Sequence, residues 1–260
     1  MRNEKTIFLC EDSVDGIFTG VYDAWDSRLG HGNVKLALKG RANYEMFASY
    51  REVETDGEKA EKVARTLRRR LGPEDYAHIY QAALSKEEER ADSIYRVAVA
   101  GLAGGRSGSI MQNLQNPAVC RIFELSRTTG NEAHRYYQFL RFRELAGGVL
   151  FSEIKPENDV LPLIGDHFAD RFPGEDFMVY DRTHRLFLIH EAFKQWVLVV
   201  GEEPDWEKIG KISDRETQFA SLWRGFCRSV AIQERRNVRL QQQFLPLKFR
   251  AYMTEMNGGA

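Results

Sequence analysis

The chain has 260 residues, a formal net charge of −1, and hydrophobic and charged fractions of 43% and 29%. These proportions are typical of a folded, soluble protein and exclude an intrinsically disordered chain. The near-neutral charge excludes an overall field that would attract nucleic acid, so any such binding must come from a local patch.

The three cysteines, Cys10, Cys120 and Cys227, lie far apart and form no C-x-x-C pair. Their odd number and wide spacing indicate reduced thiols rather than a disulfide framework or a zinc site. The apolar run from Ile7 to Cys10 is too short for a signal peptide or a membrane span. We therefore expect a cytoplasmic protein that does not cross a membrane.

Residues 1–105 predict a β-α-β-α start followed by a layer of helices. An apolar run over residues 6–10 predicts a strand, and the helical spacing of apolar residues after it predicts the first helix. Residues 50–54 resemble a second strand, and Thr55 with Glu58 has the pattern of a capping box. Three more helices are expected, over residues 57–71, 73–84 and 86–102.

A glycine-rich segment between Gly101 and Ser109 is the best candidate for a domain boundary. It lacks both the Gly-Lys-Ser/Thr ending and the G-x-G-x-x-G spacing of phosphate-binding loops, so we interpret it as a flexible connector. The predicted organisation is an N-terminal region at 1–105, a connector at 106–115 and a C-terminal α+β domain at 116–256.

The C-terminal region predicts helices first and strands after them. A helix begins at Pro117, and residues 128–131 are expected to separate it from a second helix. The expected order is then β-β-α-β-β-β, with strands over residues 138–145, 149–154, 177–180, 186–190 and 196–200. The short connections favour a mainly antiparallel sheet. The predicted fold class is therefore α+β, with C-terminal helices after the sheet.

The last fifth of the chain predicts an amphipathic helix over residues 215–240. Its apolar residues fall on one stripe that should face the core, and its arginines fall on the opposite side. The apolar residues are Phe219, Leu222, Trp223, Phe226 and Val230, and the arginines are Arg224, Arg228, Arg235 and Arg239. A row of guanidinium groups suits phosphate, whereas the alternative is an ordinary solvated helix face. A break near residues 231–237 would spoil the alignment of the last two arginines.

A second basic cluster is expected upstream. Arg141 and Arg143 would share one face of the strand at 138–145, and His167 and Arg171 lie four residues apart on one helical face. With aromatic walls, these side chains would form a groove that grips a nucleic-acid backbone and stacks bases. The walls would come from Tyr136, Tyr137, Phe142 and Phe168. The alternative is that these arginines pair with nearby carboxylates.

Nucleic acid is therefore expected to contact Arg141, Arg143, His167, Arg171, Arg235, Arg236, Asn237 and Arg239, with Gln241 able to reach a base edge or sugar.

No motif identifies a catalytic centre. The six histidines form no H-x-x-x-H or H-E-x-x-H pair, so no metal site is expected, and no G-x-S-x-G elbow is present. Carboxylates near strand ends suit general acid–base work, although such residues usually lie in solvated turns. They are Glu144, Glu153, Asp176 and Asp181. No catalytic residue is assigned, and no cofactor is expected.

Several spaced motifs resemble one bacterial family. They include Glu132-x-His134-Arg135, His167-Phe168-x-x-Arg171-Phe172, Trp223-x-x-Phe226-x-x-Ser229 and Arg235-x-Asn237-x-x-Leu240-Gln241, with Asp15-Gly16-Ile17-Phe18-Thr19-Gly20 near the start. The chain resembles, over nearly its whole length, proteins of DNA metabolism or DNA repair that carry a C-terminal domain of unknown function.

The resemblance implies a role in DNA repair or modification beside a radical S-adenosylmethionine (radical SAM) protein. Members are typically paired in genomes with such a protein, and a similar domain occurs fused to uracil-DNA glycosylase-like domains. This chain lacks the cysteine triplet of a radical iron–sulfur enzyme, so it would be the partner. Two alternatives stay open: a hydrolase-like enzyme that acts on DNA through Glu153, Asp181 or a neighbour, and an adaptor that docks the radical SAM protein without contacting DNA.

Overall fold

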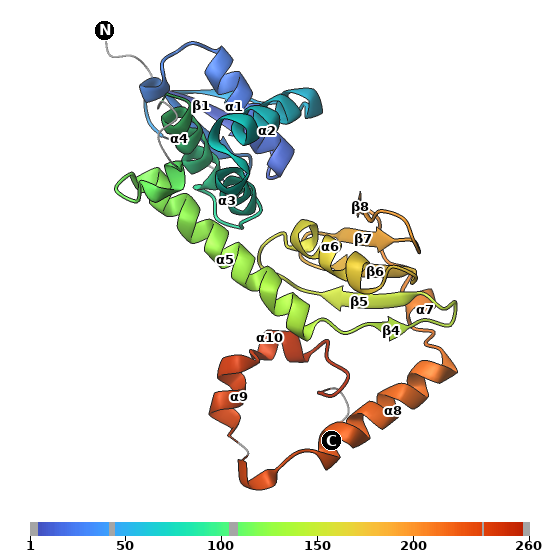
Figure 1. Cartoon of the computed structure of the whole chain (residues 1–260). Coiled ribbons are helices and arrows are strands. Elements are labelled where there is room, and N and C mark those ends of the chain that lie inside the picture. Colours follow the sequence, from blue (N-terminus) through green and yellow to red (C-terminus); the bar gives the residue numbers. More distant parts are fainter. Residues whose placement is uncertain (1–4, 42–44, 104–108, 236, 257–260) are drawn as a thin grey trace. The chain divides into compact units, whose positions relative to one another are not determined.

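The structure, a computed structural model, describes residues 5–41, 45–103, 109–235 and 237–256 (Figure 1). The chain divides into two compact units, Met1–Asn131 and Glu132–Ala260. This division falls within helix α5 (Pro117–Phe139), downstream of the connector expected at 106–115. Residues 106–108 of that connector lie outside the described part, and the domain boundaries expected from the sequence stay predictions.

The fold is mixed α+β, with a parallel sheet, a mixed sheet and C-terminal helices, which confirms the predicted fold class. The first unit contains a three-stranded parallel sheet in the order β2-β1-β3. Its elements are β1 (Lys5–Cys10), α1 (Val14–Asp26), η1 (His31–Asn33), β2 (Val34–Leu38), β3 (Ala48–Glu52), α2 (Gly57–Leu71), α3 (Pro73–Ala83), α4 (Arg90–Ala103) and η2 (Ile110–Gln112). Strand β2 was not predicted, although its Val34, Leu36 and Leu38 are buried in strict alternation.

Local capping explains where two helices of this unit begin. The Ser13 side chain accepts a hydrogen bond from a backbone amide in the first turn of α1. The Asp56 carboxylate accepts two such bonds at the start of α2. The predicted cap at Thr55 is therefore wrong by one residue, because the Thr55 hydroxyl donates to Glu11 instead.

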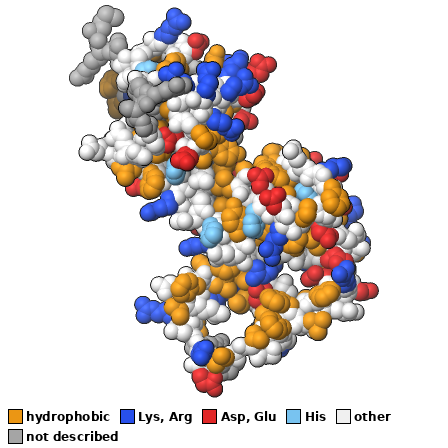
Figure 2. Space-filling view, viewed as in Figure 1, with side chains coloured by type: hydrophobic (Ala, Val, Ile, Leu, Met, Phe, Trp, Pro, Cys, Tyr) orange, Lys and Arg blue, Asp and Glu red, His pale blue; other side chains and the backbone are white. Residues whose placement is uncertain are grey.

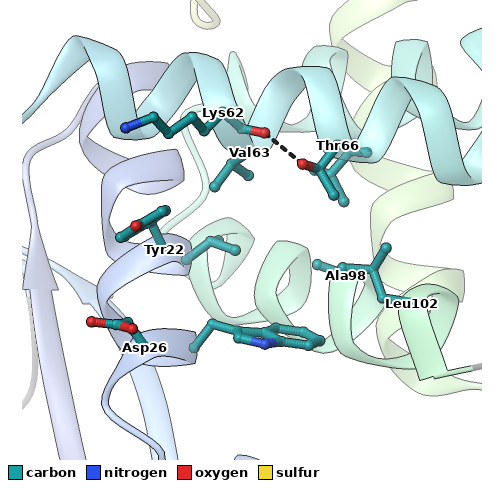
Figure 3. A pocket seen from close by; sticks show the side chains of 10 residues that line it. Tyr22, Asp26, Lys62, Val63, Thr66, Ala98 and Leu102 are labelled. Carbon is teal, nitrogen blue, oxygen red and sulfur yellow. Dashed lines mark hydrogen bonds between the residues drawn. The ribbon is translucent and has the colours of Figure 1, made fainter.

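A cavity of about 400 Å³ lies among α1, α2 and α4 of the first unit (Figure 3). Its wall is mostly apolar, with Trp25, Val63 and Leu102 among the lining side chains. The Thr66 hydroxyl is turned back onto its own helix, where it donates to the carbonyl of Lys62 at 2.7 Å. The sequence singled out no residue of this wall.

The second unit contains a five-stranded sheet in the order β4-β5-β6-β7-β8. Its strands are β4 (Arg143–Glu144), β5 (Leu150–Ile154), β6 (Phe177–Asp181), β7 (Leu186–His190) and β8 (Val197–Val200), with α6 (Leu161–Arg171) between β5 and β6 in the chain. This is the predicted order, and most pairs are antiparallel as expected. The β5–β6 pair is parallel, because the connection through α6 is long enough for a crossover. The carboxyl ends of β5 and β6 consequently meet at one edge of the sheet.

Helix α5 is longer than the sequence predicted and replaces part of the first expected strand. It runs unbroken past Thr129, where two helices were expected to separate. Thr129 and Ala133 are each buried, and burial of a helix face can override weak local helix propensity. Of the strand expected over 138–145, only β4 forms. Arg141 lies outside β4, so the prediction that it shares a strand face with Arg143 is wrong.

The last segment of the chain consists of short helices, and Figure 1 shows α8, α9 and α10 following one another along an arc. The elements are α7 (Trp206–Ile209), α8 (Asp214–Ser229), η3 (Gln233–Arg235), α9 (Val238–Phe244) and α10 (Leu247–Arg250). The helix expected over 215–240 thus ends at Ser229, with the break that the sequence allowed. None of the helices that the structure describes is long and apolar enough to cross a membrane.

The apolar stripe of α8 faces solvent, so the prediction that it faces the core is wrong. Its five side chains, Phe219, Leu222, Trp223, Phe226 and Val230, are 42% to 68% exposed. Figure 2 shows hydrophobic side chains gathered over the C-terminal helices. Helical periodicity reveals that a face is apolar but not what covers it.

Candidate nucleic-acid interface

The C-terminal helices of the second unit line a cavity of about 910 Å³, which we call the arginine cavity. Its lining residues are Arg224, Cys227, Arg228, Ala231, Ile232, Arg235, Asn237, Leu240, Gln241, Phe244, Arg250, Glu255 and Met256. The sequence predicted Arg235 and Asn237 as nucleic-acid contacts. The cavity brings these two together with Arg224 and Arg228 of α8.

Positive charge dominates the arginine cavity, which has four lining arginines and one glutamate. In the part of the chain that the structure describes, Arg224, Arg228 and Arg235 make no ion pair with an acidic side chain. Arg228 and Arg235 are exposed, and Arg224 is half-buried. Unpaired guanidinium groups on one concave wall favour a ligand with several anionic oxygens.

Two amide side chains extend this wall. Asn237 caps α9, where its Oδ1 accepts a hydrogen bond from the Leu240 amide at 2.9 Å. This bond uses the carbonyl oxygen and leaves the side-chain NH2 as a donor, and Gln241 lines the wall one turn later. Arg239 is exposed on α9 but is not among the lining residues, and Arg236 lies outside the described residues.

The upstream arginines are arranged differently. Arg141 pairs with Glu255 at 3.0 Å, so its charge is neutralised, and it reaches the arginine cavity only through that glutamate. The guanidinium of Arg143, on β4, lies 5.3 Å from the ring centroid of Phe151. The alternative that the sequence left open, that these arginines pair with carboxylates, therefore holds for Arg141.

His167 and Arg171 share helix α6, as the sequence predicted. The His167 ring packs against Tyr137, with 4.3 Å between ring centroids, and the Arg171 guanidinium lies 5.7 Å from the Phe172 ring. Phe168, expected as a wall of an open groove, is buried in the core. Neither His167 nor Arg171 is among the residues that line the arginine cavity, and their contact with nucleic acid stays a prediction.

Glu132 of α5 accepts hydrogen bonds from two other segments of the second unit, at Asn158 and at Lys248. Its carboxylate accepts a hydrogen bond from Nζ of Lys248 at 2.7 Å, and two more from the amide and side chain of Asn158 at 2.9 and 2.7 Å. Burial opposes the charged form, but these hydrogen bonds outweigh it and lower the pKa of Glu132. Lys248 belongs to α10, so this contact positions the helix that carries Arg250 into the cavity wall.

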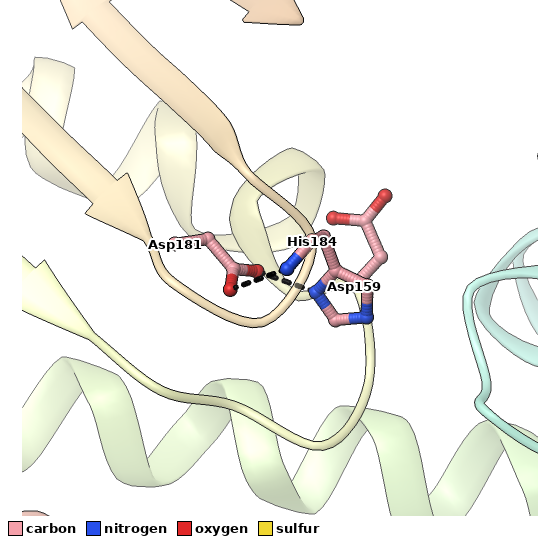
Figure 4. Close-up of side chains that lie close together, drawn as sticks. All are labelled: Asp159, Asp181 and His184. Atoms are coloured by element: carbon pink, nitrogen blue, oxygen red, sulfur yellow. Dashed lines mark hydrogen bonds and ion pairs between the residues drawn. The ribbon is translucent and has the colours of Figure 1, made fainter. Parts of the chain in front are cut away.

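A second cluster lies where β5 and β6 end together (Figure 4). Asp159 follows β5, Asp181 ends β6, and His184 lies in the turn after it. Nδ1 of His184 is 2.6 Å from Oδ2 of Asp181, whose side chain is fully buried. One candidate ligand atom from each residue lies within 4.8 Å of the others.

This cluster has the composition of a histidine–carboxylate site. A carboxylate that accepts a proton from Nδ1 fixes the tautomer and the orientation of the imidazole ring. The sequence alone shows part of this cluster, because Asp181 lies three residues before His184. Asp159 joins them only through the parallel pairing of β5 with β6, so sequence reasoning, which expected no metal site, missed the cluster.

Two of the other strand-end carboxylates have structural partners. Glu153 pairs with Arg182 at 2.9 Å. Asp176 accepts a hydrogen bond from the Ala192 amide at 2.7 Å, which closes a loop. Glu144, the remaining candidate, is half-buried on β4. These contacts favour structural roles for Glu153 and Asp176.

A family model described as a domain of unknown function, DUF4130, matches residues 88–255, well over half of the chain. The chain belongs to the DUF4130 family. The match includes the cluster at Asp181 and every lining residue of the arginine cavity except Met256. It confirms the C-terminal domain of unknown function that the resemblance implied.

No curated protein matches this DUF4130 chain. A solved structure described as the DHH domain of a member of the s1p family of ribosomal proteins is similar over 73% of this chain and 74% of that chain. The sequence identity is 11% and the TM-score is 0.34. That likeness is too weak to bear on the fold or the function.

Proposed function

We propose that this DUF4130 protein binds DNA through the arginine cavity and acts in DNA repair or DNA metabolism. The observation that supports the proposal is that Arg224, Arg228 and Arg235 all line this cavity and make no ion pair with an acidic side chain among the described residues. Guanidinium groups bind phosphate oxygens in a bidentate manner and retain their charge at any physiological pH. A molecule with a net charge of −1 thereby gains a local site for a polyanion.

The size and the polar groups of the cavity suit a nucleotide segment. Its volume of about 910 Å³ is in the range of small-molecule sites. The amide side chains of Asn237 and Gln241 supply neutral hydrogen-bonding groups beside the charged ones. Phosphate contacts would position the strand, and the amides would reach a sugar or a base edge.

The test is the salt dependence of DNA binding, measured by fluorescence anisotropy with single- and double-stranded oligonucleotides of about 15 nucleotides. Each phosphate contact contributes about one unit to the slope of log affinity against log salt concentration. The double substitution Arg228→Ala with Arg235→Ala should therefore reduce the slope by about two units. The control is Arg65→Ala, an exposed arginine of the first unit that is paired with Glu61.

Absence of binding to both forms of DNA would contradict the proposal. The proposal would also be contradicted if the slope of log affinity against log salt concentration were as steep in the double variant as in the Arg65→Ala control.

We also propose that the exposed stripe of α8 docks the radical SAM protein that the family resemblance implies. Five half-exposed apolar side chains of this size present on the order of 500 Å² of surface, which is typical of a protein-binding patch. Leu222→Glu with Phe226→Glu should abolish co-purification of the two co-expressed proteins. Val200→Glu, at a more exposed apolar position on β8, should preserve it. A complex that survives the stripe substitutions would contradict this docking site.

A second candidate function is hydrolysis of DNA at the cluster at Asp181. The observation that favours it is the 2.6 Å contact between the buried Asp181 carboxylate and His184. Such a pair suits general-base activation of water. His184→Ala should abolish any nuclease activity of the purified chain, assayed with and without divalent cations, while DNA affinity at the arginine cavity persists. Activity that survives His184→Ala would exclude this role.

A further inference from the structure

One acidic side chain that lines the arginine cavity, Glu255, has a hydrogen-bond donor for only one of its two carboxylate oxygens among the described residues. The Glu255 side chain is 10% exposed, and its Oε1 accepts a hydrogen bond from Arg141 at 3.0 Å. Its Oε2 is also buried and has no hydrogen-bond partner within the residues that the structure describes. A buried carboxylate oxygen without a donor is costly, so the position favours a ligand that supplies an N–H or O–H group.

A second buried group among the residues that line the cavity, a donor on Arg250, has no acceptor. Arg250 donates from Nε to the carbonyl of Leu245 at 3.2 Å, which fixes the guanidinium group. Its Nη2 is buried and has no acceptor among the described residues. Both side chains line the cavity, and each has one buried atom without a partner among the described residues: an acceptor on Glu255 and a donor on Arg250.

These two groups select against a simple anion. A phosphodiester or sulfate group has neither an N–H nor an O–H to donate to Oε2 of Glu255. The rest of the wall between the polar groups is apolar, with Ile232, Leu240 and Phe244 among its side chains. A planar group that packs against apolar side chains and carries a donor beside an acceptor on its edge is a nucleobase.

We propose that Glu255 and Arg250 form a base-reading site for one unpaired nucleobase, with Glu255 Oε2 accepting from an exocyclic amino group and Arg250 Nη2 donating to the neighbouring ring nitrogen or carbonyl. Bases with an amino group, above all cytosine and adenine, meet both requirements. Thymine has no amino group: its N3–H lies between two carbonyl oxygens, so one carbonyl would face the carboxylate and weaken the contact. The inference rests on the proposed DNA binding, since the cavity arginines would hold the strand whose base enters.

The experiment compares single strands that differ only in their central nucleotides, which are deoxycytidine, thymidine or abasic residues. The wild-type protein should bind the deoxycytidine strand about tenfold more tightly than the abasic strand, with thymidine close to the abasic value. Glu255→Gln removes the charged acceptor without a change of shape and should reduce this preference to near unity. Glu255→Asp, which keeps the charge but withdraws the oxygen, should also reduce it.

The matched control is Glu234→Gln, which makes the same substitution at an exposed glutamate of the C-terminal segment that is not among the residues lining the cavity. It should keep the wild-type base preference. Thermal melts of each variant establish that it folds. If Glu234→Gln loses the preference as fully as Glu255→Gln does, or if Glu255→Gln keeps it, the proposal is overturned.

Two further outcomes distinguish this proposal from the proposed function. Salt-dependent binding with equal affinity for all three strands would overturn base reading and leave DNA binding intact. If no strand binds, DNA binding fails, and saturation-transfer NMR with free deoxycytidine decides on the base site. A transfer signal in the wild type that Glu255→Gln removes would support the site, whereas no signal in the wild type would overturn it.

Discussion

Cys10 lies in the core of the first unit, where it faces Gly20 of α1 and has no exposed surface. Burial, with a smaller contribution from Asp23, raises the pKa of the Cys10 thiol to about 12. We expect Cys10 to resist DTNB at pH 8 in the folded protein, because the thiolate is the reactive form. The half-buried Cys120 and Cys227 should react under the same conditions. Reaction of all three thiols at one rate before urea is added would contradict this expectation.

Gly165 of α6 is a position where no larger residue fits. A Cβ atom there would lie 2.5 Å from Cε2 of Trp196, whose indole Nε1 donates to Asp166 at 2.7 Å. Gly165→Ala should therefore lower the free energy of unfolding by about 1–3 kcal/mol, measured by urea denaturation. Gly147→Ala is the control, since a Cβ atom at Gly147 meets nothing within 4 Å. Equal stability of the two variants would mean that the Trp196 ring moves aside freely.

Arginines that look alike in the sequence differ in the charge that they offer to a ligand. Arg141 and Arg235 each lie within two residues of another arginine, and both were predicted to contact nucleic acid. Arg141 is neutralised by Glu255, a residue more than a hundred positions away, whereas Arg235 is exposed on the cavity wall. The acidic partner of a cation is a tertiary contact, so only the folded chain identifies which arginines remain unpaired.

At the scale of the element, the exposed stripe of α8 has a thermodynamic signature. Leu222 is 68% exposed, so Leu222→Ala should change the free energy of unfolding by less than about 0.5 kcal/mol. Ile164 of α6 has no exposed surface, and Ile164→Ala should cost about 2–5 kcal/mol. Urea denaturation of the isolated chain measures both. A cost above 1 kcal/mol for Leu222→Ala would mean that the stripe is buried in solution.

The contact between Glu132 of α5 and Lys248 of α10 should make the second unit sensitive to acid. The pKa of Glu132 is lowered on folding, so its contribution to stability is present above its ordinary value of 4.5 and is lost as the pH falls through the folded value. The pKa of Lys248 is raised, so its contribution is present below its ordinary value of 10.5 and is lost only as the pH rises through the folded value. The stabilisation should therefore be complete between these two limits.

Glu132→Gln tests this contact. The substitution should lower the free energy of unfolding at pH 7 by about 1–3 kcal/mol, because Lys248 and the Asn158 donors lose a charged acceptor. It should also flatten the fall in stability below pH 4.5. The measurement is urea denaturation at a series of pH values. Glu58→Gln, at an exposed position on α2, is the control, and an acid limb equally steep in all three proteins would exclude the contact as its cause.

At the scale of the whole molecule, the two compact units have separate hydrophobic cores. One core contains Ile17 and Ile94 of the first unit, and another contains Ile164 and Leu188 of the second. Ile17→Ala should therefore reduce the hydrogen-exchange protection of the first unit and leave that of β6 and β7 unchanged. Exchange measured by mass spectrometry on peptic fragments tests this, and a uniform loss of protection would indicate a single cooperative unit.

Local geometry, rather than overall charge, distinguishes the arginine cavity from the rest of the described surface. The chain has 37 basic and 38 acidic side chains, so its mean field gives no preference for a polyanion. Many surface cations are paired, such as Lys59 with Asp23 and Lys35 with Glu45. The arginine cavity is different because its one carboxylate, on Glu255, is already paired with Arg141.

The sequence by itself determined most of the elements and their order, although strand β2 was missed and α5 replaced part of one expected strand. Helix α2 at residues 57–71 and strand β7 at residues 186–190 form where the sequence predicts them, because caps, breakers and apolar periodicity act within a few residues. Tertiary structure alone decided three other features. The parallel pairing of β5 with β6 brought Asp159 beside Asp181, folding paired Arg141 with Glu255, and no packed neighbour covers the stripe of α8 among the described residues. Each of these depends on contacts between residues far apart in the chain, which no local pattern records.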